Sequence, residues 1–413
     1  MTRFSLFFLL FVFQFSSGQS PWPSESWNNA TALTSVMSTA GVLELSGLHY
    51  NPDLNRLYAV QGDGRVRVME LNTATNTFTQ IANKAISEGP EGITQADFSA
   101  NEFYTIDENN YEIRKFTHTA NFSTVTLSKQ WNLLASPSPM QDTGNTGPEG
   151  IAFVPDANLS AIGFTSPLSG LPYTSQKGAG GLFFVAHQSG GYIWVFDINP
   201  NVSNDFAYVG KIKTNRSESC DLAFDRTTGL LYILHNVGVN FIEVSDLATY
   251  INTTQNEPQL HMVNEYFVSS PTVGNKNIEG LAITPKCTTN GVASLWLCRD
   301  VESGDALAAQ QDVLRWFTPV ALDGECEALK NESFIAQTDA VVVYPNPGNN
   351  LITLEVENSS DYRATFSNVL GQEVLHYVSN TNKTLDVSSL AKGMYLIEIF
   401  TSKGKSTIKW IKK

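Results

Sequence analysis

The chain has 413 residues, of which 42% are apolar and 11% aromatic, enough for two domains or for one large repeat domain with an addition. Its formal net charge of −14 argues against nucleic acid or an anionic membrane surface as the main partner. The charge is compatible with metal cations, although acidity also keeps an exported protein soluble. Apolar residues show no sustained helical spacing, so the sequence favours many short strands.

The first 18 residues have the composition of a secretory signal peptide. Arg3 supplies a positive charge, residues 4–15 are apolar, and residues 16–18 are small. The apolar run is too short to span a bilayer comfortably, and no later segment is long enough, so we expect export without a transmembrane segment. Export permits disulfides among Cys220, Cys287, Cys298 and Cys326. Of the three possible pairings we favour Cys287 with Cys298, because they flank an expected hairpin.

Residues 19–40 are rich in Ser, Asn and Thr and form a lead-in, part of which can close a sheet as an outer strand. After them one unit recurs, with a clear copy at Gly147-Pro148-Glu149-Gly150-Ile151. Each copy has an acidic residue at an apolar strand, a second apolar run, a polar turn and a third strand. The expected strands cover residues 44–50, 56–60, 65–71 and 77–82; 91–98, 102–106 and 111–116; 149–154, 181–186 and 192–197; 221–224, 230–234 and 239–244; and 279–283, 294–297 and 313–317.

The spacing of the units predicts the architecture. The acidic positions are 44, 91, 149, 221 and 279, so the intervals are 47, 58, 72 and 58 residues, and the longest contains an insertion at 155–180. Such periods, with three or four strands per unit, are typical of propeller blades. We therefore predict an all-β propeller over residues 19–340, with five blades favoured and six possible. A β-sandwich with chance similarities is the alternative.

The repeat also predicts a site at one end of the central channel. The first strand of each blade is innermost, so the five acidic residues are expected to ring one channel mouth. The turns after the second strands lie on the same face and are expected to form a second ring of Gln61, Asp107, His187, His235 and Arg299. His49 follows its inner strand and is expected toward the opposite face.

An acidic ring is unfavourable unless something compensates it, because neighbouring carboxylates raise each other's pKa. A bound divalent cation removes that cost, and a flexible set of more than four oxygens favours Ca²⁺. The sequence therefore predicts a calcium site whose ligands are Glu44, Glu91, Glu149, Asp221 and Glu279. The alternative is that these carboxylates accept hydrogen bonds between blades and hold the ring together.

Two histidines are the catalytic candidates. His187 and His235 end the second strands of successive blades, where each could act as a general base on a calcium-bound water or substrate. The alternative is a hydrogen-bonded turn histidine. Asp107 and Arg299 are the candidate ligand-binding residues, since Arg299 could meet a carboxylate or phosphate or else pair with the acidic ring. The sequence contains no nucleophile elbow, zinc-protease or phosphate-loop motif.

The texture of the sequence changes near residue 340. Four blocks follow in order: Tyr344-Pro345-Asn346-Pro347, Asn368-Val369-Leu370-Gly371-Gln372-Glu373-Val374, Asp386-Val387-Ser388-Ser389-Leu390-Ala391-Lys392-Gly393-Met394-Tyr395-Leu396, and a lysine-rich end. They resemble the type A C-terminal sorting domain of the bacterial type IX secretion system. The resemblance implies a Bacteroidota-type protein whose residues 341–413, a small Ig-like β-sandwich, engage the type IX machinery. The product would cross the outer membrane and be anchored at the cell surface or released. An adhesive Ig-like domain is the alternative.

The repeat region resembles a second family. Its Glu-Gly-Leu/Ile inner strands, its Leu-Tyr pairs and its polar turns are similar to the SdiA-regulated, phytase-esterase-like propellers, with calcium-dependent lactonases as more distant cousins. We expect a monomeric exported propeller that binds a small molecule or surface ligand with calcium at its channel. A calcium-dependent phosphoesterase, esterase or lactonase is the second interpretation, and an adhesion module the third.

Overall fold

The computed structural model describes residues 20–326, except 237, 253–256, 273–275 and 289–292, and residues 341–413, except 357–361, 369–371, 380–383 and 402–403. The expected signal peptide lies outside the described residues. The chain divides after Cys326 into two compact units. Within the described residues, no helix has both the length and the apolar character needed to cross a membrane.

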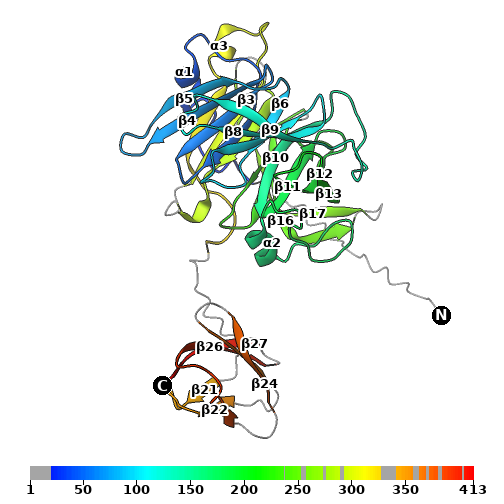
Figure 1. Ribbon diagram of the computed structural model, residues 1–413. Coiled ribbons are helices and arrows are strands. Elements are labelled where there is room, and N and C mark those ends of the chain that lie inside the picture. Colours follow the sequence, from blue (N-terminus) through cyan, green and yellow to red (C-terminus); the bar gives the residue numbers. More distant parts are fainter. Residues whose placement is uncertain are drawn as a thin grey trace, which may run out of the picture. The chain divides into compact units, whose positions relative to one another are not determined.

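The first unit is a β-propeller of five blades, each of four antiparallel strands, as the repeat predicted (Figure 1). The outer strands of blades 3 and 4 also pair in parallel, at Lys213 and Gln259, which joins these two blades into one eight-stranded sheet. Blade 1 consists of β2 (Leu45–Asn51), β3 (Arg56–Gln61), β4 (Arg65–Asn72) and β5 (Thr77–Ala85). Blade 2 consists of β6 (Pro90–Thr94), β7 (Glu102–Asp107), β8 (Glu112–His118) and β9 (Val125–Asn132). Blade 3 consists of β10 (Pro148–Pro155), β11 (Gly181–His187), β12 (Tyr192–Ile198) and β13 (Phe206–Lys213). Blade 4 consists of β14 (Asp221–Phe224), β15 (Leu230–His235), β16 (Phe241–Asn252) and β17 (Pro258–Phe267). Blade 5 contains β18 (Ile278–Ile283), β19 (Ala293–Arg299) and β20 (Leu314–Val320).

The fourth strand of blade 5 comes from the other end of the propeller. β1 (Thr31–Ala32) pairs antiparallel with β20, so the lead-in supplies the closing outer strand that the sequence predicted. Thr34, in α1 (Thr34–Met37), strengthens this closure because its Oγ1 accepts the backbone N–H groups of Val313 at 2.9 Å and Leu314 at 3.2 Å. Two further short helices lie between strands, α2 (Asp156–Ile162) in the insertion of blade 3 and α3 (Leu307–Gln310) in blade 5.

The five innermost strands, β2, β6, β10, β14 and β18, contact one another in a closed ring. Glycine makes this approach possible. A Cβ on Gly92 would lie 2.8 Å from the Cα of Gly150, and a Cβ on Gly150 would lie 2.5 Å from the Cα of Asp221. Backbone atoms cannot give way as side chains can, so a larger residue at these positions would push the inner strands apart.

The apolar cores lie between adjacent blades, because each blade buries both of its faces against its neighbours. Tyr50 of blade 1 stacks on Trp296 of blade 5 with 4.6 Å between ring centroids. Phe183 of blade 3 packs on Tyr104 of blade 2 at 4.8 Å. Burial on both faces explains why the second strands read as continuous apolar runs rather than as alternating ones.

The disulfide differs from the pairing that the sequence favoured. Cys287 bonds to Cys326, with 5.2 Å between their Cα atoms, whereas Cys220 and Cys298 are buried free thiols. The preference for Cys287 with Cys298 is therefore wrong. Cys298 lies inside β19 and directs its sulfur at the backbone of β2, where its Sγ is 3.3 Å from the carbonyl oxygens of Leu45 and Ser46. Cys287 lies outside the sheet, in the turn η1 (Lys286–Thr288).

The second unit is a small β-sandwich. One sheet contains β21 (Val341–Tyr344), β22 (Leu351–Val356) and β25 (Thr384–Asp386), and the other contains β24 (Glu373–Val378), β23 (Arg363–Ser367), β26 (Gly393–Thr401) and β27 (Gly404–Lys412). Its core includes Phe366, Ile397 and Trp410. The Tyr-Pro-Asn-Pro block is bonded to the last strand, because the Trp410 indole N–H donates to the Pro345 carbonyl at 2.9 Å and Asn346 Nδ2 donates to the Lys409 carbonyl at 2.7 Å.

Candidate functional site

Three of the predicted acidic residues share one structural position. Glu91, Glu149 and Glu279 each stand one residue before an inner-strand glycine, at a register shift between the first and second strands of the blade. Such a bulge turns a side chain out of the regular alternation. We call these three glutamates the acidic mouth.

The other two blades differ from the predicted five-member ring. In blade 1 the residue before the glycine is Ser46, whereas Glu44 precedes the strand, is exposed, and has a positive φ of 50°. In blade 4 Asp221 of the first strand pairs with Leu234 of the second. Gly92 and Ile106 form the equivalent pair in blade 2, so the aspartate occupies the position that glycine has there. An acidic residue near each strand start was visible in the sequence, but its register was not.

Asp221 projects among the inner strands and hydrogen-bonds to backbone groups. Its Oδ2 accepts the N–H of Leu281 at 2.7 Å and that of Leu48 at 3.4 Å, and its Oδ1 accepts the N–H of Leu222 at 2.8 Å. Burial raises the pKa of Asp221 well above its ordinary value, and these donors partly offset the rise. This carboxyl group joins three blades, as in the inter-blade alternative that the sequence left open.

The three carboxyl groups of the acidic mouth have pKa values above the ordinary value for glutamate. Burial raises the pKa of Glu91 to about 7, and the nearby Glu108 and Asp300 add to the rise. The pKa values of Glu149 and Glu279 are raised well above the ordinary value by burial and then by neighbouring acidic groups. In the described part of the chain, none of the three forms an ion pair with Lys, Arg or His. Each instead meets an uncharged group or another carboxyl group.

The partners of the acidic mouth fit partly protonated carboxyl groups. Ser46 hydrogen-bonds Glu91, and Asn277 Nδ2 donates to Glu279 Oε1. Glu149 and Glu108 share a hydrogen bond, which requires a proton on one of the two carboxyl groups. Among the described residues, no three Asp, Glu, His or Cys side chains are arranged as a preformed metal-binding group.

The members of the second predicted ring are the last residues of the second strands rather than turn residues, and the following contacts engage them within their own blades. Buried Asp107 pairs with Arg114 and accepts the N–H of Asn110 at 2.6 Å. Buried Arg299 donates from Nε to the carbonyl of Asp312 at 2.8 Å. Gln61 donates to the Leu43 carbonyl at 2.7 Å and accepts from Arg67. These contacts therefore stabilise the individual blades.

The two candidate histidines are also buried. Burial lowers the pKa of His187 to about 4, so its imidazole is neutral, and its Nδ1 has no hydrogen-bond partner among the described residues. His235 is held at both ring nitrogens, by the carbonyl of Glu218 and by Glu243 Oε2, the latter at 3.3 Å. His187 and His235 belong to neighbouring blades, and the structure gives no contact that joins them.

A groove lies beside the acidic mouth on blade 4. It encloses about 710 Å³ and is lined by Val239, Asn240, Phe267, Lys276 and Asn277, among others. A smaller recess of about 50 Å³ adjoins it through Val239 and reaches His235. Asn277 lines the groove and donates a hydrogen bond to Glu279, so it connects the acidic mouth with the groove.

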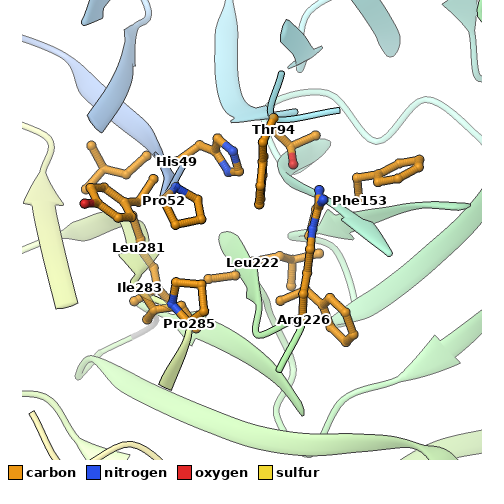
Figure 2. Close-up of a pocket in the computed structure, with 16 residues that line it drawn as sticks. His49, Pro52, Thr94, Phe153, Leu222, Arg226, Leu281, Ile283 and Pro285 are labelled. Atoms are coloured by element: carbon orange, nitrogen blue, oxygen red, sulfur yellow. The ribbon is translucent and has the colours of Figure 1, made fainter. Parts of the chain in front are cut away.

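A separate pocket occupies the other end of the channel and was missed by the sequence reasoning (Figure 2). We call it the Arg226 pocket. All five inner strands contribute to it from their C-terminal ends, with Leu48, Leu222 and Leu281 among its apolar walls and His49 and Arg226 as its basic groups. His49 lies on the face opposite the acidic mouth, as predicted. Arg226 follows Asp221 by five residues and lies just past the end of the inner strand of blade 4. The repeat alone therefore could have placed it at the channel end opposite the acidic residues.

The fold and the channel define this protein as a β-propeller joined to a small β-sandwich. Comparison with family models then shows what the two parts resemble. Residues 342–413 match the secretion system C-terminal sorting domain. Residues 29–162 match the SdiA-regulated family. Both resemblances inferred from the sequence are thus confirmed. The sorting domain assigns the chain to the proteins that secretion machinery exports across the outer membrane, to the cell surface or the medium.

Two further comparisons add little about activity. No curated protein matches the chain. Among solved structures, the β-propeller domain of Cps50 (Swd1) from Myceliophteria thermophila matches with 11% identity and a TM-score of 0.29. The match covers 48% of this chain and 53% of that one, so it spans about half of each.

Proposed function

We propose that this exported propeller is a ligand-binding protein that takes up a cation, Ca²⁺ in the first instance, at its acidic mouth. The observation that supports the proposal is the set of three partly buried glutamates, Glu91, Glu149 and Glu279, contributed by three blades, with which no basic side chain among the described residues forms an ion pair. Oxygen donors of this kind select Ca²⁺ over softer metals. The adjoining groove would hold the ligand that the cation recruits.

Cation uptake at this mouth is coupled to proton release. The three carboxyl groups are not arranged as metal ligands in the protonated state, so binding requires them to ionise and to turn toward a shared ion. Glu149 would have to give up the hydrogen bond that it shares with Glu108. Binding should therefore strengthen as the pH rises through about 7, the pKa of Glu91.

Thermal unfolding tests the proposal. The protein is unfolded in excess chelator and then in excess calcium, at pH 6 and at pH 8. An ion that binds only the folded state at 100 times its dissociation constant adds about 2.7 kcal/mol, which corresponds to a rise of several degrees in Tm. We expect the rise at pH 8 to exceed that at pH 6.

Matched variants identify the ligands. Glu149→Gln and Glu279→Gln should each reduce the calcium-dependent rise in Tm, whereas Glu25→Gln in the N-terminal segment should leave it unchanged. If calcium gives no rise in the parent protein, or an equal rise in Glu149→Gln, the cation proposal is wrong and the glutamates are inter-blade hydrogen-bond partners.

The hydrolase interpretation depends on His235, which reaches the recess beside the groove. Both of its ring nitrogens are engaged, so it would have to release Glu243 or the Glu218 carbonyl before accepting a proton from substrate. Turnover of a phosphoester, ester or lactone with calcium, lost in His235→Ala, would favour this second function.

A further inference from the structure

The Arg226 pocket is remote from the acidic mouth. Glu91, in β6, lies at one mouth and Ala96, two residues past the end of that strand, lies next to the other, so the two ends are separated by roughly 16 Å at 3.3 Å per residue. Between them the inner strands approach closely at their glycines, and Asp221 hydrogen-bonds to the backbone of Leu48 and Leu281 on two other inner strands. A ligand of this pocket is therefore independent of any cation at the acidic mouth.

Arg226 presents a guanidinium group whose acidic neighbours, Asp53 and Asp97, act on it electrostatically without forming an ion pair. Its Nη2 donates to the carbonyls of Gln95 at 2.9 Å and Ala96 at 3.2 Å, which fixes the position of the group. Its Cζ lies 3.7 Å from the centroid of the Phe98 ring and 5.8 Å from that of Phe153, so aromatic rings support the planar cation.

The charge on Arg226 is costly where it lies. Within the described residues Arg226 makes no ion pair with a carboxylate, and the structure gives hydrogen-bond partners to its Nη2 alone. Burial lowers the pKa of this arginine to about 10. A half-buried guanidinium with unused N–H donors is stabilised by an anion that reaches it.

His49 adds a second unsatisfied group. Its Nε2 is buried and has no hydrogen-bond partner among the described residues, while its ring packs 5.8 Å from Phe98 and 6.3 Å from Tyr58. Burial and the nearby Arg226 lower the pKa of His49 to about 3, so the ring is neutral. Figure 2 shows the His49 ring and the Arg226 guanidinium on the same side of Leu222.

The size and walls of the pocket limit the anion. The space is about 40 Å³, and one water requires about 10–15 Å³ measured in this way, so it admits an end group of roughly three heavy atoms. Leu48, Leu222 and Leu281 supply the apolar part of the walls. A carboxylate can accept from the Nε and Nη1 N–H groups that the two carbonyls leave free, whereas a dianionic phosphate would find too few donors.

We propose that the Arg226 pocket binds the carboxylate of a small monocarboxylic acid with a short apolar chain. Arg226 holds the carboxylate through its unused N–H groups, His49 Nε2 takes part in a further hydrogen bond, and the leucines pack against the chain. The site is distinct from the acidic mouth in position, charge and ligand.

Binding of butyrate to the full-length protein tests this assignment, with calorimetry as the measurement and chelator present throughout. Butyramide and butylamine have the same chain but lack the negative charge. We expect butyrate to bind and the other two to bind at least about tenfold more weakly, since hydrogen bonds to a charged group are worth about that factor or more. Equal binding of butyramide, or no binding of butyrate, would overturn the proposal.

Variants locate the site. Arg226→Gln should weaken butyrate binding by about tenfold or more, and Arg226→Lys should also weaken it because lysine keeps the charge but loses the planar group that packs on Phe98. Arg65→Gln, the same change at the first residue of β4, where the side chain is 42% exposed, is the matched control and should bind as the parent does. Unchanged affinity in the Arg226 variants would contradict the proposal.

Arg226→Gln could fail to fold, since Nη2 bonds to the end of β6. The side-chain N–H signals of Arg226 in the parent protein then provide the second measurement, assigned by their absence in Arg226→Lys. Butyrate must shift these signals selectively, and a titration that leaves them unmoved would refute the site.

Discussion

Glu91 shows at the scale of a single residue how the channel converts burial into pH dependence. Its ordinary pKa is 4.5 and burial raises it to about 7. The folded protein therefore retains a proton that the unfolded chain has lost, and this favours the folded state at low pH. The contribution is complete below about pH 4.5 and is lost as the pH rises through 7.

We accordingly predict that, in chelator, the protein is less stable at pH 8 than at pH 5, with Glu91 contributing up to about 3 kcal/mol. Glu91→Gln imitates the protonated carboxyl group and should weaken this pH dependence, whereas Glu25→Gln should not. Urea unfolding at the two pH values measures both. A parent protein that is more stable at pH 8 would contradict the direction of the raised pKa.

At the scale of elements, the closure of blade 5 by the N-terminal lead-in holds the ring together. Trp27 anchors this segment. It is completely buried, lies edge-on to Phe317 with 6.1 Å between centroids, and donates its indole N–H to Asp312 Oδ2 at 3.0 Å. A propeller is closed only when its first and last segments share a blade, so the contacts of Trp27 stabilise the whole ring.

Trp27→Ala should therefore destabilise the propeller by about 3–5 kcal/mol, the usual effect of removing a buried aromatic side chain. Trp22→Ala is the matched control, because Trp22 lies in the same segment and packs on Phe317 but is only partly buried. Thermal unfolding should show a larger loss for Trp27. Equal losses would indicate that the lead-in does not depend on this anchor.

At the scale of the whole molecule, the Cys287–Cys326 disulfide ties the point where the chain leaves the propeller to blade 5. The two cysteines are 39 residues apart, and closing a loop of that length is worth about 4 kcal/mol in the chain-entropy model. Such a bond suits a protein exported through an oxidising compartment.

Replacing both cysteines with serine should lower the free energy of unfolding by up to about 4 kcal/mol, and reducing the parent protein should have the same effect. Denaturant unfolding with and without reductant measures the two. A reductant effect that persists in the double variant would show that the loss comes from another source.

Much of the architecture could be predicted because it depends on local pattern. The recurring acidic-Gly-apolar strand predicted the blades, and the four C-terminal blocks predicted the sorting domain. The site could be predicted only in part. Glu91, Glu149 and Glu279 share one strand position, whereas Glu44 and Asp221 stand one or two residues out of that register, and such a shift changes where a side chain points.

The sequence by itself determined the repeat, the export signals of the C-terminal segment and the acidic character of the inner strands, since spacing and composition carry these properties directly. Only the tertiary structure decided the disulfide partner, the engagement of His235 and Arg299 within their blades, and the meeting of His49 with Arg226. Such features depend on contacts between residues up to 177 positions apart, as for His49 and Arg226. The register of the five packed inner strands fixes these contacts, and no local pattern in the sequence encodes them.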